Sequence, residues 1–546
     1  MDTQNWKNQL FFGDNIFILK DLYFEYPKGF IDLIYIDPPF NSKRNYNVLF
    51  ESIDLSDSTA QKEAFADTWS NISYLDTLNE LSKLDLHLYN FLKNLENIGI
   101  SFSAISYLTT MSIRIWYMQK LLKDTGSFYL HCDSTMSHYL KIACDLIFGE
   151  SHFRDEIIWK RTNSLKTSQF KDRKFPVSTD SILFYTKSDN YNFDSDIVKV
   201  PFTKEEIIEH YPFQDEKGRF TKSPLFRSMG MGERPNLCYE YKGVSAPSKA
   251  GWKISLPKLI EYDNNGDIDW SNPKTPYRKY RPEHTKGWLV SNIWTDIVQT
   301  GGDERQGYPT QKPEALLERI IKASSLDNDL IADFFCGCGT TIAVADKLKR
   351  PWLGVDISHL AVRLIANRIG KDNIDKTFEI HGLPKDLASA KELANNVKGG
   401  RLEFEAWVVE FLLHGILNER RNEMGFDGYR TFDANGKKCF VIIEVKSGNV
   451  TMAHFNHFIQ TVANKNGDIG LFVCFEEQLT KNMNIAAKKE GAFEINGNAF
   501  CDKIQIATIE DLLDNRFPHI PESTKETFKK AVKKATSNND HPKLDL

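Results

Sequence analysis

The first residues able to do chemistry stand where a short apolar run stops. Ile31–Ile36 is β-branched and apolar, which predicts a buried strand, and Asp37–Asn41 (Asp-Pro-Pro-Phe-Asn) follows it directly. Two consecutive prolines cannot continue a sheet ladder and donate no N–H, so the Asp37 carboxylate and the proline carbonyls act only as hydrogen-bond acceptors. Open α/β sheets bind ligands at such strand ends. The loop is therefore a candidate ligand-binding site.

A second candidate site is a glycine-rich turn between a predicted strand, Asp329–Asp333, and a predicted helix, Gly339–Lys349. Gly337 and Gly339 let the backbone turn tightly and approach a ligand, although a lone Gly-x-Gly is often a plain turn. Asp356, at the end of the next predicted strand, can accept hydrogen bonds from both hydroxyls of a ribose. Because no Walker lysine is present, the pattern favours a nucleoside cofactor without phosphate groups over ATP.

A third group of chemical side chains lies near the C-terminal end. Asp427 precedes a predicted strand, Cys439–Val445, which contains Glu444, and Lys446 comes two residues after Glu444. Alternate strand residues share a face, so two carboxylates and an amine can meet at one edge. Oxygen ligands of this kind suit Mg²⁺, and the lysine can orient an attacking water. The plainer alternative is a surface ion pair on an edge strand.

The elements around the first two sites alternate between helices and strands. Helical spacing covers 74–98 and 111–123, with a break at Thr125-Gly126; a strand is predicted at 127–132, a helix then runs to 147, another covers 313–322, and a strand covers 352–356. This alternation predicts a parallel α/β sheet. Between 151 and 307 the period is lost, which predicts an inserted module of strands and loops. A further helix is predicted at 403–417.

Bulk composition narrows the class of protein. The chain has 546 residues, more than one core usually supports, and its 41% hydrophobic and 26% charged residues indicate several globular domains. Without an apolar run of about 20 residues or a signal peptide, we expect a cytoplasmic location and no membrane partner. The eight scattered cysteines suit reduced, buried thiols. Cys336 and Cys338 have no second Cys or His pair nearby, which argues against a zinc site.

The net charge of −5 means that any surface for nucleic acid must be local. Basic side chains concentrate in two segments, Lys160, Arg161, Lys166, Lys171, Arg173 and Lys174 in one, and Lys274, Arg278, Lys279, Arg281 and Lys286 in the other. Taken alone, either cluster is more often an ordinary solvated face.

Taken together, these segments resemble a known enzyme family. Asp37–Phe40 and Phe335–Gly339 are similar to the catalytic and cofactor motifs of the amino-methyltransferases that act on DNA. The catalytic motif precedes the cofactor motif with a long insert between them, an order that resembles the beta group of that family. The similarity covers residues from about 8 to 370. Further matching segments are Phe12–Asn15, Gly126–Asp133, Ile158–Arg161, Asn292–Asp296 and Tyr308–Pro313.

The resemblance implies a Rossmann-like α/β sheet of permuted strand order that binds S-adenosylmethionine. Phe335 and the two glycines would approach the methionine part of the cofactor, Asp356 the ribose and Asp14 the adenine amino group; without the family context, Asp14 is equally well explained as a turn residue. The segment Thr310–Pro313 would lie beside the carboxylate of the cofactor. The implied cofactor-binding residues are Asp14, Thr310, Lys312, Asp333, Phe335, Gly337, Gly339, Thr340 and Asp356.

The implied reaction is methyl transfer to the exocyclic amine of a base flipped out of double-stranded DNA. Acceptors on Asp37 and the Pro38 carbonyl favour the pyramidal, more nucleophilic amine, and Phe40 is placed to stack on the base. The implied catalytic residues are Asp37, Pro38, Pro39 and Phe40. Aspartate at the first position resembles the adenine-N6 enzymes, so we expect a site-specific adenine methyltransferase, with N4-cytosine left open. The plainer alternative makes Asp37 a turn cap and Phe40 a core residue.

The C-terminal segment resembles the restriction-endonuclease fold of the PD-(D/E)XK type. Its implied Mg²⁺ site comprises Asp427, Glu444, Lys446 and Glu405. Three readings stay open: a methyltransferase fused to a nuclease-like domain in a restriction–modification or defence system, an endonuclease–methyltransferase that mainly cleaves DNA, and a DNA-binding protein without either activity. A homodimer is also left open.

The expected domain plan follows from these assignments. It comprises a catalytic half at 1–154, a target-recognition insert at 155–300, a cofactor-binding half at 301–385, a restriction-endonuclease-like domain at 400–520 and a polar tail at 521–546.

Overall fold

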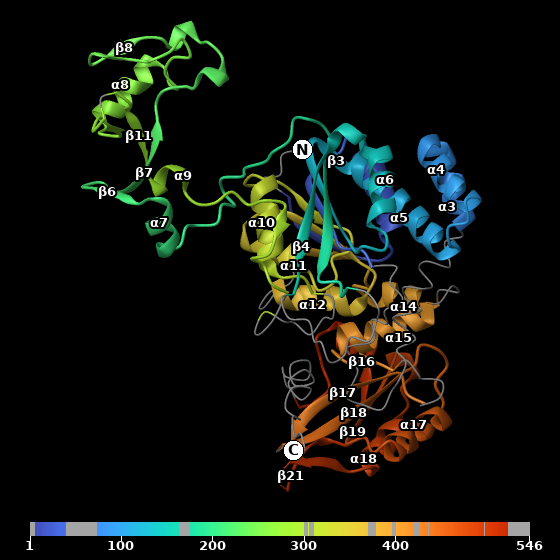
Figure 1. Ribbon diagram of the computed structural model, residues 1–546. Helices are drawn as coiled ribbons and strands as arrows, with labels where there is room; N and C mark the ends of the chain where they lie inside the picture. The colour runs from blue at the N-terminus through green and yellow to red at the C-terminus, as the bar shows by residue number, and fades with distance from the viewer. Residues whose placement is uncertain are drawn as a thin grey trace, which may run out of the picture. The chain divides into compact units, whose positions relative to one another are not determined.

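The computed structural model describes residues 6–39, 74–162, 175–272, 274–299, 304, 311–369, 378–395, 400–418, 425–434, 436–495 and 497–521. The chain separates into two compact units (Figure 1). Unit 1 combines Met1–Phe193 with Asn292–Leu546, and unit 2 is Asp194–Ser291. Phe40, Thr310 and all but the first residue of the expected polar tail lie outside the described residues.

Unit 1 contains a sheet that, across the described residues, has nine strands in the order β12-β4-β5-β3-β2-β13-β14-β1-β15. In chain order the strands are β1 (Asn8–Phe12), β2 (Ile31–Ile36), β3 (Leu122–Cys132), β4 (Phe153–Lys160), β5 (Thr179–Thr186), β12 (Ile293–Trp294), β13 (Ile331–Asp333), β14 (Trp352–Asp356) and β15 (Phe378–His381). The central pairs are parallel, but β5 runs antiparallel to both β3 and β4. The sheet is therefore mixed, whereas the alternation of elements had predicted a parallel one.

Helices cover both faces of this sheet (Figure 1). One layer consists of α1 (Asn15–Glu25), α3 (Tyr74–Leu84), α4 (Leu86–Asn97), α5 (Phe102–Leu121) and α6 (Ser137–Phe148), and the other of α10 (Glu314–Ser324), α11 (Thr340–Lys347) and α12 (His359–Ile369). Buried leucines, isoleucines and aromatic side chains of the first layer form one continuous core with the strands beneath them. The parallel strands, buried on both faces, accordingly carry apolar runs.

The structure differs from the sequence expectation at three places in this part of unit 1. The helical spacing over 74–98 is two helices, because Asp85 accepts a hydrogen bond from Leu88 N (3.0 Å) and begins α4 anew. The helix expected at 111–123 begins earlier, at Phe102, where Ser101 caps it. The break expected at Thr125-Gly126 lies inside β3, which absorbs it by a register shift against β2.

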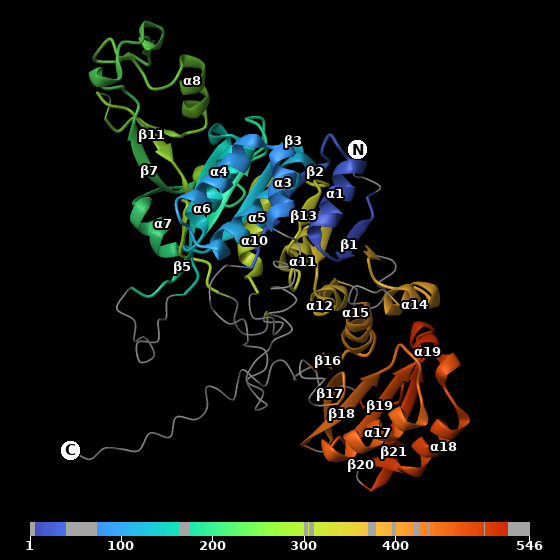
Figure 2. The same ribbon diagram turned by 90° about the vertical axis from the view of Figure 1, so that its right-hand side faces the viewer.

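The C-terminal part of unit 1 is a second α/β layer. Two short helices, α14 (Leu387–Asn395) and α15 (Gly400–Ala406), precede it, and α15 continues into one π-helical segment, Trp407–Leu412, so the helix expected at 403–417 ends early. The described strands order as β16-β17-β18-β19-β22, namely β16 (Ile416–Leu417), β17 (Gly428–Ala434), β18 (Lys437–Val445), β19 (Ile469–Cys474) and β22 (Ile504–Thr508). Helices α17 (Met452–Asn464) and α18 (Lys481–Lys489) pack on this sheet (Figure 2).

Unit 2 is narrower than the insert expected at 155–300, because β4 and β5 bury Ile157, Trp159 and Tyr185 within the large sheet. The described strands of unit 2 pair in the order β10-β11-β7-β6, with a separate β8-β9 pair. These are β6 (Phe213–Asp215), β7 (Gly218–Pro224), β8 (Glu240–Tyr241), β9 (Val244–Ser245), β10 (Ile268–Asp269) and β11 (Tyr277–Tyr280). Within unit 2, α7 (Lys204–His210) lies at one end and α8 (Leu256–Asn264) at the other (Figures 1 and 2).

The cysteines and the helices agree with the composition. All eight cysteines are free in the structure, and six of them are buried. Among the described helices, none has the length and apolar character needed to span a membrane.

Candidate active site

Three aspartates gather at one edge of the large sheet. The strands β2, β13 and β14 are parallel neighbours, with Ala332 paired to Ile34 and Asp333 paired to Gly354. Asp37 follows β2, Asp333 ends β13 and Asp356 ends β14, so all three stand at carboxyl ends of adjacent strands. Neighbouring strands lie about 4.8 Å apart. The acidic loop and the glycine turn therefore open at the same edge.

The Asp37 carboxylate is buried on one side and paired on the other. One of its oxygens, Oδ2, forms an ion pair with Lys312, the residue two positions before α10. Its other oxygen, Oδ1, is buried and has no hydrogen-bond partner among the described residues. Sequence analysis had placed Lys312 beside the carboxylate of a cofactor, and the structure brings it to Asp37. Next in the loop, Pro38 is buried and Pro39 half-buried.

The glycine turn is held by hydrogen bonds from its own backbone to the two flanking aspartates. Asp333, 2% exposed, accepts from Phe335 N (2.9 Å) and from the Thr341 hydroxyl (2.6 Å). Asp356 accepts from Gly337 N (2.8 Å) on one oxygen and from a backbone N–H on the other. Asp333 therefore fixes the turn with both oxygens. Asp356 joins the turn to β14.

Burial raises the pKa of both aspartates. The pKa of Asp333 rises to about 7, with the charges of Asp37 and Asp356 adding to the effect of burial. The pKa of Asp356 rises to about 6 because of burial, against the backbone N–H groups that stabilise its charge. These aspartates and Asp37 thus form one acidic edge.

Gly339 is needed in this turn for two reasons. Its φ of 74° lies in the left-handed region that favours glycine. A Cβ at this position would meet Ile365 Cγ1 of α12 at 2.4 Å. The first residue of α11, Thr340, is buried directly after it. The turn and two helices are therefore packed against one another at van der Waals distance.

A buried arginine behind the turn was not predicted from the sequence. Arg114 of α5, 2% exposed, donates from Nη2 to Asp14 Oδ1 (2.8 Å) and from Nε to Asn15 Oδ1 (2.5 Å). Asn15 Nδ2 in turn donates to Phe334 O in the glycine turn (2.7 Å). Asp14 also caps α1 through Ile16 N. An arginine inside an apolar helix carries no local signal of this link, because its partners are about a hundred residues away in sequence.

A second missed group lies beside Asp37. Tyr35, His131 and Asp180 form a buried chain, from the Tyr35 hydroxyl to His131 Nδ1 (2.9 Å) and from His131 Nε2 to Asp180 Oδ2 (3.3 Å). Burial alone would raise the pKa of Asp180, but the hydrogen bond with His131 and the charges of Arg161 and Lys312 hold it below its ordinary value. Arg161, expected in a basic cluster, pairs with Asp180. This side of the acidic loop is therefore lined by buried polar side chains that hydrogen-bond to one another.

The C-terminal candidate residues also come together in part. Glu444 lies on β18, the middle strand of its described sheet, and is 7% exposed, so a surface ion pair on an edge strand is wrong. Glu444 Oε1 pairs with Lys446, and its Oε2 is buried without a partner among the described residues. Asp427 accepts from Val445 N (2.7 Å). Burial raises the pKa of Glu444 to about 7, and the charges of Asp427 and Glu405 contribute to the rise.

Glu405 of α15 is buried, its charge adds to the rise in the pKa of Glu444, and its Oε1 accepts a hydrogen bond from Arg401 (3.1 Å). Across the part of the chain that the structure describes, no three His, Cys, Asp or Glu side chains are grouped so as to hold a metal ion. Asp427 and Glu444 are therefore the two acids that meet at neighbouring strands, with Lys446 beside Glu444 and Glu405 near enough to act on it.

Comparison with known proteins places residues 31–367 on a family described as DNA methylase. The type II methyltransferase M.EcaI of Enterobacter cloacae is 31% identical over 266 residues, 48% of this chain and 57% of its own length. The StyLTI Mod subunit of a type III restriction-modification enzyme of Salmonella typhimurium is 27% identical over 422 residues, 72% of this chain and 59% of its own. The chain thus spans just under three fifths of these two relatives, at 57% and 59%.

Two further comparisons concern a shorter relative and a solved structure. The DNA adenine methyltransferase YhdJ of Escherichia coli is 23% identical over 358 residues, covering 65% of this chain and 81% of its own. The crystal structure of the M1.HpyAVI–SAM complex aligns with 66% of this chain and 98% of its own at 14% identity and a TM-score of 0.31.

Proposed function

This chain belongs to the DNA methylase family, and from that premise we propose that it transfers a methyl group from S-adenosylmethionine to adenine N6 in double-stranded DNA. The proposal rests on the Asp37 carboxylate. Its Oδ1 is buried without a partner among the described residues, at the sheet edge where the glycine turn also opens. A buried acceptor left unpaired costs free energy unless a ligand supplies a donor. An amino group presents such a donor.

The residues of the turn fit a nucleoside cofactor. Asp356 offers a carboxylate one strand beyond Asp333, and the left-handed glycine backbone leaves the turn without side chains at its closest approach. Asp14 accepts a hydrogen bond from Arg114, and its neighbour Asn15 donates one to Phe334 O in the same turn. When bound, S-adenosylmethionine supplies an electrophilic methyl group. The turn lacks the lysine of a phosphate-binding Walker motif, which supports a nucleoside cofactor without phosphate groups.

Asp37 and Pro38 carry the chemistry of the acceptor side. Lys312 fixes Asp37 Oδ2, which leaves Oδ1 as the acceptor for one amine hydrogen, and the Pro38 carbonyl is the proposed acceptor for the other. Two acceptors localise the lone pair on nitrogen and stabilise the positive charge that develops during transfer. The base reaches this edge only after leaving the duplex. No covalent intermediate is required.

The choice of adenine rests on the residue type at position 37 and on one relative. Aspartate in the loop resembles the adenine-directed enzymes, and the matched YhdJ is named a DNA adenine methyltransferase. The strands β2 and β13 are neighbours although 300 residues of sequence separate Ile31 from Ile331, which supports a permuted sheet. We assign target recognition to unit 2 and the segment leading to it.

The test is direct. Purified protein is incubated with labelled S-adenosylmethionine and bacterial DNA in EDTA, and the DNA is hydrolysed to nucleosides. Label in N6-methyladenine supports the proposal. Label in N4-methylcytosine would mean that the target base is cytosine and not adenine. Absence of label in DNA, with cofactor binding intact, would contradict the transfer. Single-molecule sequencing of DNA from expressing cells then identifies the methylated sequence.

A second function is favoured by the acidic pair in the C-terminal sheet. Asp427 directly precedes β17, the antiparallel neighbour of the strand that carries Glu444, and the buried Glu444 Oε2, unpartnered among the described residues, can serve as an oxygen ligand. We infer that these two carboxylates hold a divalent cation such as Mg²⁺ in a nuclease-like domain. DNA and water would complete the coordination of such an ion. Cut DNA in Mg²⁺ that disappears in Glu444→Ala supports cleavage, whereas Mn²⁺ binding without cuts supports a DNA-binding module.

A further inference from the structure

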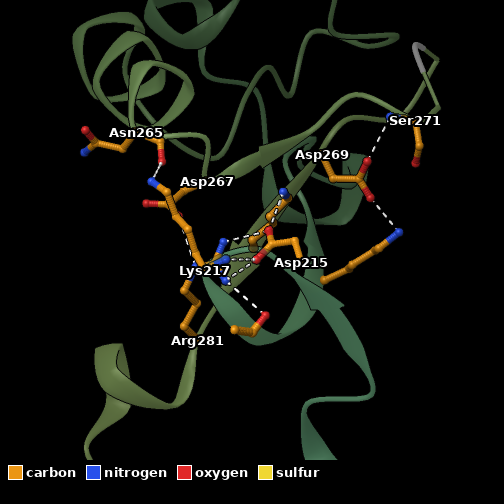
Figure 3. A network of polar contacts seen from close by, with 10 residues as sticks. Asp215, Lys217, Asn265, Asp267, Asp269, Ser271 and Arg281 are labelled. Carbon is orange, nitrogen blue, oxygen red and sulfur yellow. Dashed lines mark hydrogen bonds and ion pairs between the residues drawn. The ribbon is translucent and has the colours of Figure 1, made fainter.

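Figure 3 shows a network of polar contacts in unit 2, in which three aspartates, Asp215, Asp267 and Asp269, pair with nearby cations. Arg281, 5% exposed, donates to both oxygens of Asp215 (2.8 and 2.9 Å) and to Asp267 (3.4 Å). Lys279 also pairs with Asp215 (2.8 Å). These hydrogen bonds, the one from Arg281 first, hold the pKa of Asp215 well below its ordinary value. Arg281 and Lys279 are therefore engaged in the fold of unit 2.

This corrects the second basic cluster expected from sequence. Arg278 lies against two aromatic rings, 3.8 Å from the Tyr262 centroid and 4.4 Å from that of Tyr280. With Arg281 and Lys279 paired to Asp215, three of the five cations in that cluster serve the interior contacts of unit 2. The cluster is thus a poor candidate for binding phosphates.

Other cations of unit 2 have no such partner. Arg234, Lys249 and Lys253 are exposed, and they form no ion pair within the described residues. Arg234 N donates to Lys249 O (3.1 Å), and Lys253 N donates to Leu225 O (2.7 Å), so the backbone brings these cations around one loop. The charged side chains of the segment 227–253 are Arg227, Glu233, Arg234, Glu240, Lys242, Lys249 and Lys253.

The loop that directly precedes Arg234, Ser228–Glu233, carries two exposed methionines. Met229 is 57% and Met231 56% exposed. Arg227 closes the base of the loop, donating from its backbone N to Gly251 O (3.0 Å) and from Nη2 to Met231 O (2.6 Å). The chain that returns from the loop is anchored by fully buried Trp252, which stacks on Tyr239. An ordered loop thus presents an apolar tip to solvent.

Exposed apolar side chains on a fixed loop, flanked by cations, suit duplex DNA. Phosphates meet the cations, and methionine is among the apolar side chains that wedge against base steps in a groove. We propose that the loop Ser228–Glu233 enters a groove of the DNA substrate, with Met229 and Met231 against the bases and Arg234 and Lys249 on the flanking phosphates. This inference rests on the proposed function, since it needs DNA as the partner.

The experiment compares two double variants with matched controls in the full-length protein. Met229→Ser/Met231→Ser removes the apolar tip, and Arg234→Ala/Lys249→Ala removes the cations. The controls are Leu289→Ser, which removes a 67% exposed apolar side chain elsewhere in unit 2, and Lys204→Ala, which removes an exposed cation at the start of α7. The binding of a fluorescent random-sequence duplex is measured at several salt concentrations.

We expect the methionine variant to bind DNA about tenfold more weakly with an unchanged salt slope. The cation variant should reduce the slope of log Kd against log salt by about one for each phosphate that its side chains no longer neutralise. Controls should match the parent. Parent-like DNA binding by the methionine variant, or an equal loss in Leu289→Ser, would overturn the inference.

The methylation assay separates this inference from the proposed function. If the parent binds DNA through the loop but labels no base, the methyl transfer fails and the loop assignment stands. If the parent labels DNA and both double variants label it at the parent rate at limiting DNA, the loop assignment fails and the transfer stands. A circular dichroism melt confirms that each variant is folded.

Discussion

Two carboxylate–lysine pairs in this chain share a local design and differ in what surrounds them. In the large sheet Asp37 pairs with Lys312 through one oxygen, and in the C-terminal sheet Glu444 pairs with Lys446 through one oxygen. In each, the second oxygen is buried without a partner in the described structure. The second oxygen of Asp37, at a strand end, and that of Glu444, on a strand, can therefore each accept a hydrogen bond or bind a cation.

The difference lies in the source of the lysine and in the nearest acid. Lys312 comes from a segment 275 residues away and joins two halves of one sheet edge, whereas Lys446 directly follows the end of β18, the strand that carries Glu444. Asp427 lies near Glu444, and its charge adds to burial in raising the pKa of Glu444 to about 7. The first arrangement suits a neutral donor such as an amine, and the second favours a cation that would relieve the repulsion between two acids.

The largest expected effect comes from Asp37→Ala. Methyl transfer should fall by about 10²–10³ or more, because the acceptor that stabilises the transition state is lost. Cofactor affinity, measured by calorimetry, should remain that of the parent. Asp356→Ala is the matched aspartate variant at the same edge. In that variant we expect weakened cofactor binding, in contrast to Asp37→Ala, which should lose methyl transfer and keep cofactor binding. Normal methylation by Asp37→Ala would break the comparison at its first member.

Removing the long-range lysine should cost both stability and activity. Lys312→Met leaves the partly buried Asp37 without its cation, and we expect a loss of up to about 3 kcal/mol in the free energy of unfolding together with reduced methylation. Urea denaturation measures the first and labelled cofactor the second. Lys322→Met, which breaks a more exposed pair with Glu318 one helix turn apart, should cost about 0.5 kcal/mol or less. Equal losses in the two variants would deny any special role to the Asp37 pair.

Glu444→Gln tests the second pair through pH. The folded pKa of about 7 exceeds the ordinary value of 4.5, so the folded state holds more protons between these values and stability falls as pH rises through that window. Above it the full penalty applies, at most about 3 kcal/mol for a shift of this size. The glutamine variant lacks this penalty. It should therefore gain stability relative to the parent at about pH 8 and not at about pH 4.

Denaturation of parent and variant at both pH values supplies the measurement, with exposed Glu494→Gln as the matched control. The control should show the same difference from the parent at each pH. A Glu444→Gln difference that does not change with pH would mean that the pKa of Glu444 is the same in the folded and unfolded states.

The strand ends of the large sheet were predictable because their signals are local. Apolar runs that stop at Asp37, Asp333 and Asp356 have the period and length of buried parallel strands, and β14 was expected at its observed bounds. The same reasoning could not find the pairing of Lys312 with Asp37. A lysine before a helix looks alike whether it meets solvent, a ligand or an acid 275 residues away.

Arg114 shows the same limit from inside a helix. Its helix, α5, is apolar on nearly every face, so a lone arginine there is compatible with a solvated stripe as much as with a buried link to Asp14. In unit 2 the basic cluster at 274–286 was visible in the sequence, but its neutralisation by Asp215 depends on the antiparallel pairing of β11 with β7. Charge counted along a chain does not reveal charge left over after folding.

The smallest expected effect comes from Asp427→Asn, and it sharpens the second pair. The amide oxygen can still accept from Val445 N, so the fold of β17 and β18 should persist. Removing one acid lowers the pKa of Glu444 toward its ordinary value, while burial keeps part of the rise, and stability at about pH 8 should increase by about 1 kcal/mol. If the pair holds a divalent ion, Mn²⁺ binding by calorimetry should weaken in both Asp427→Asn and Glu444→Gln. Mn²⁺ binding that survives both changes would mean that the two acids do not bind the ion. Lys446 alone would then offset the repulsion between them.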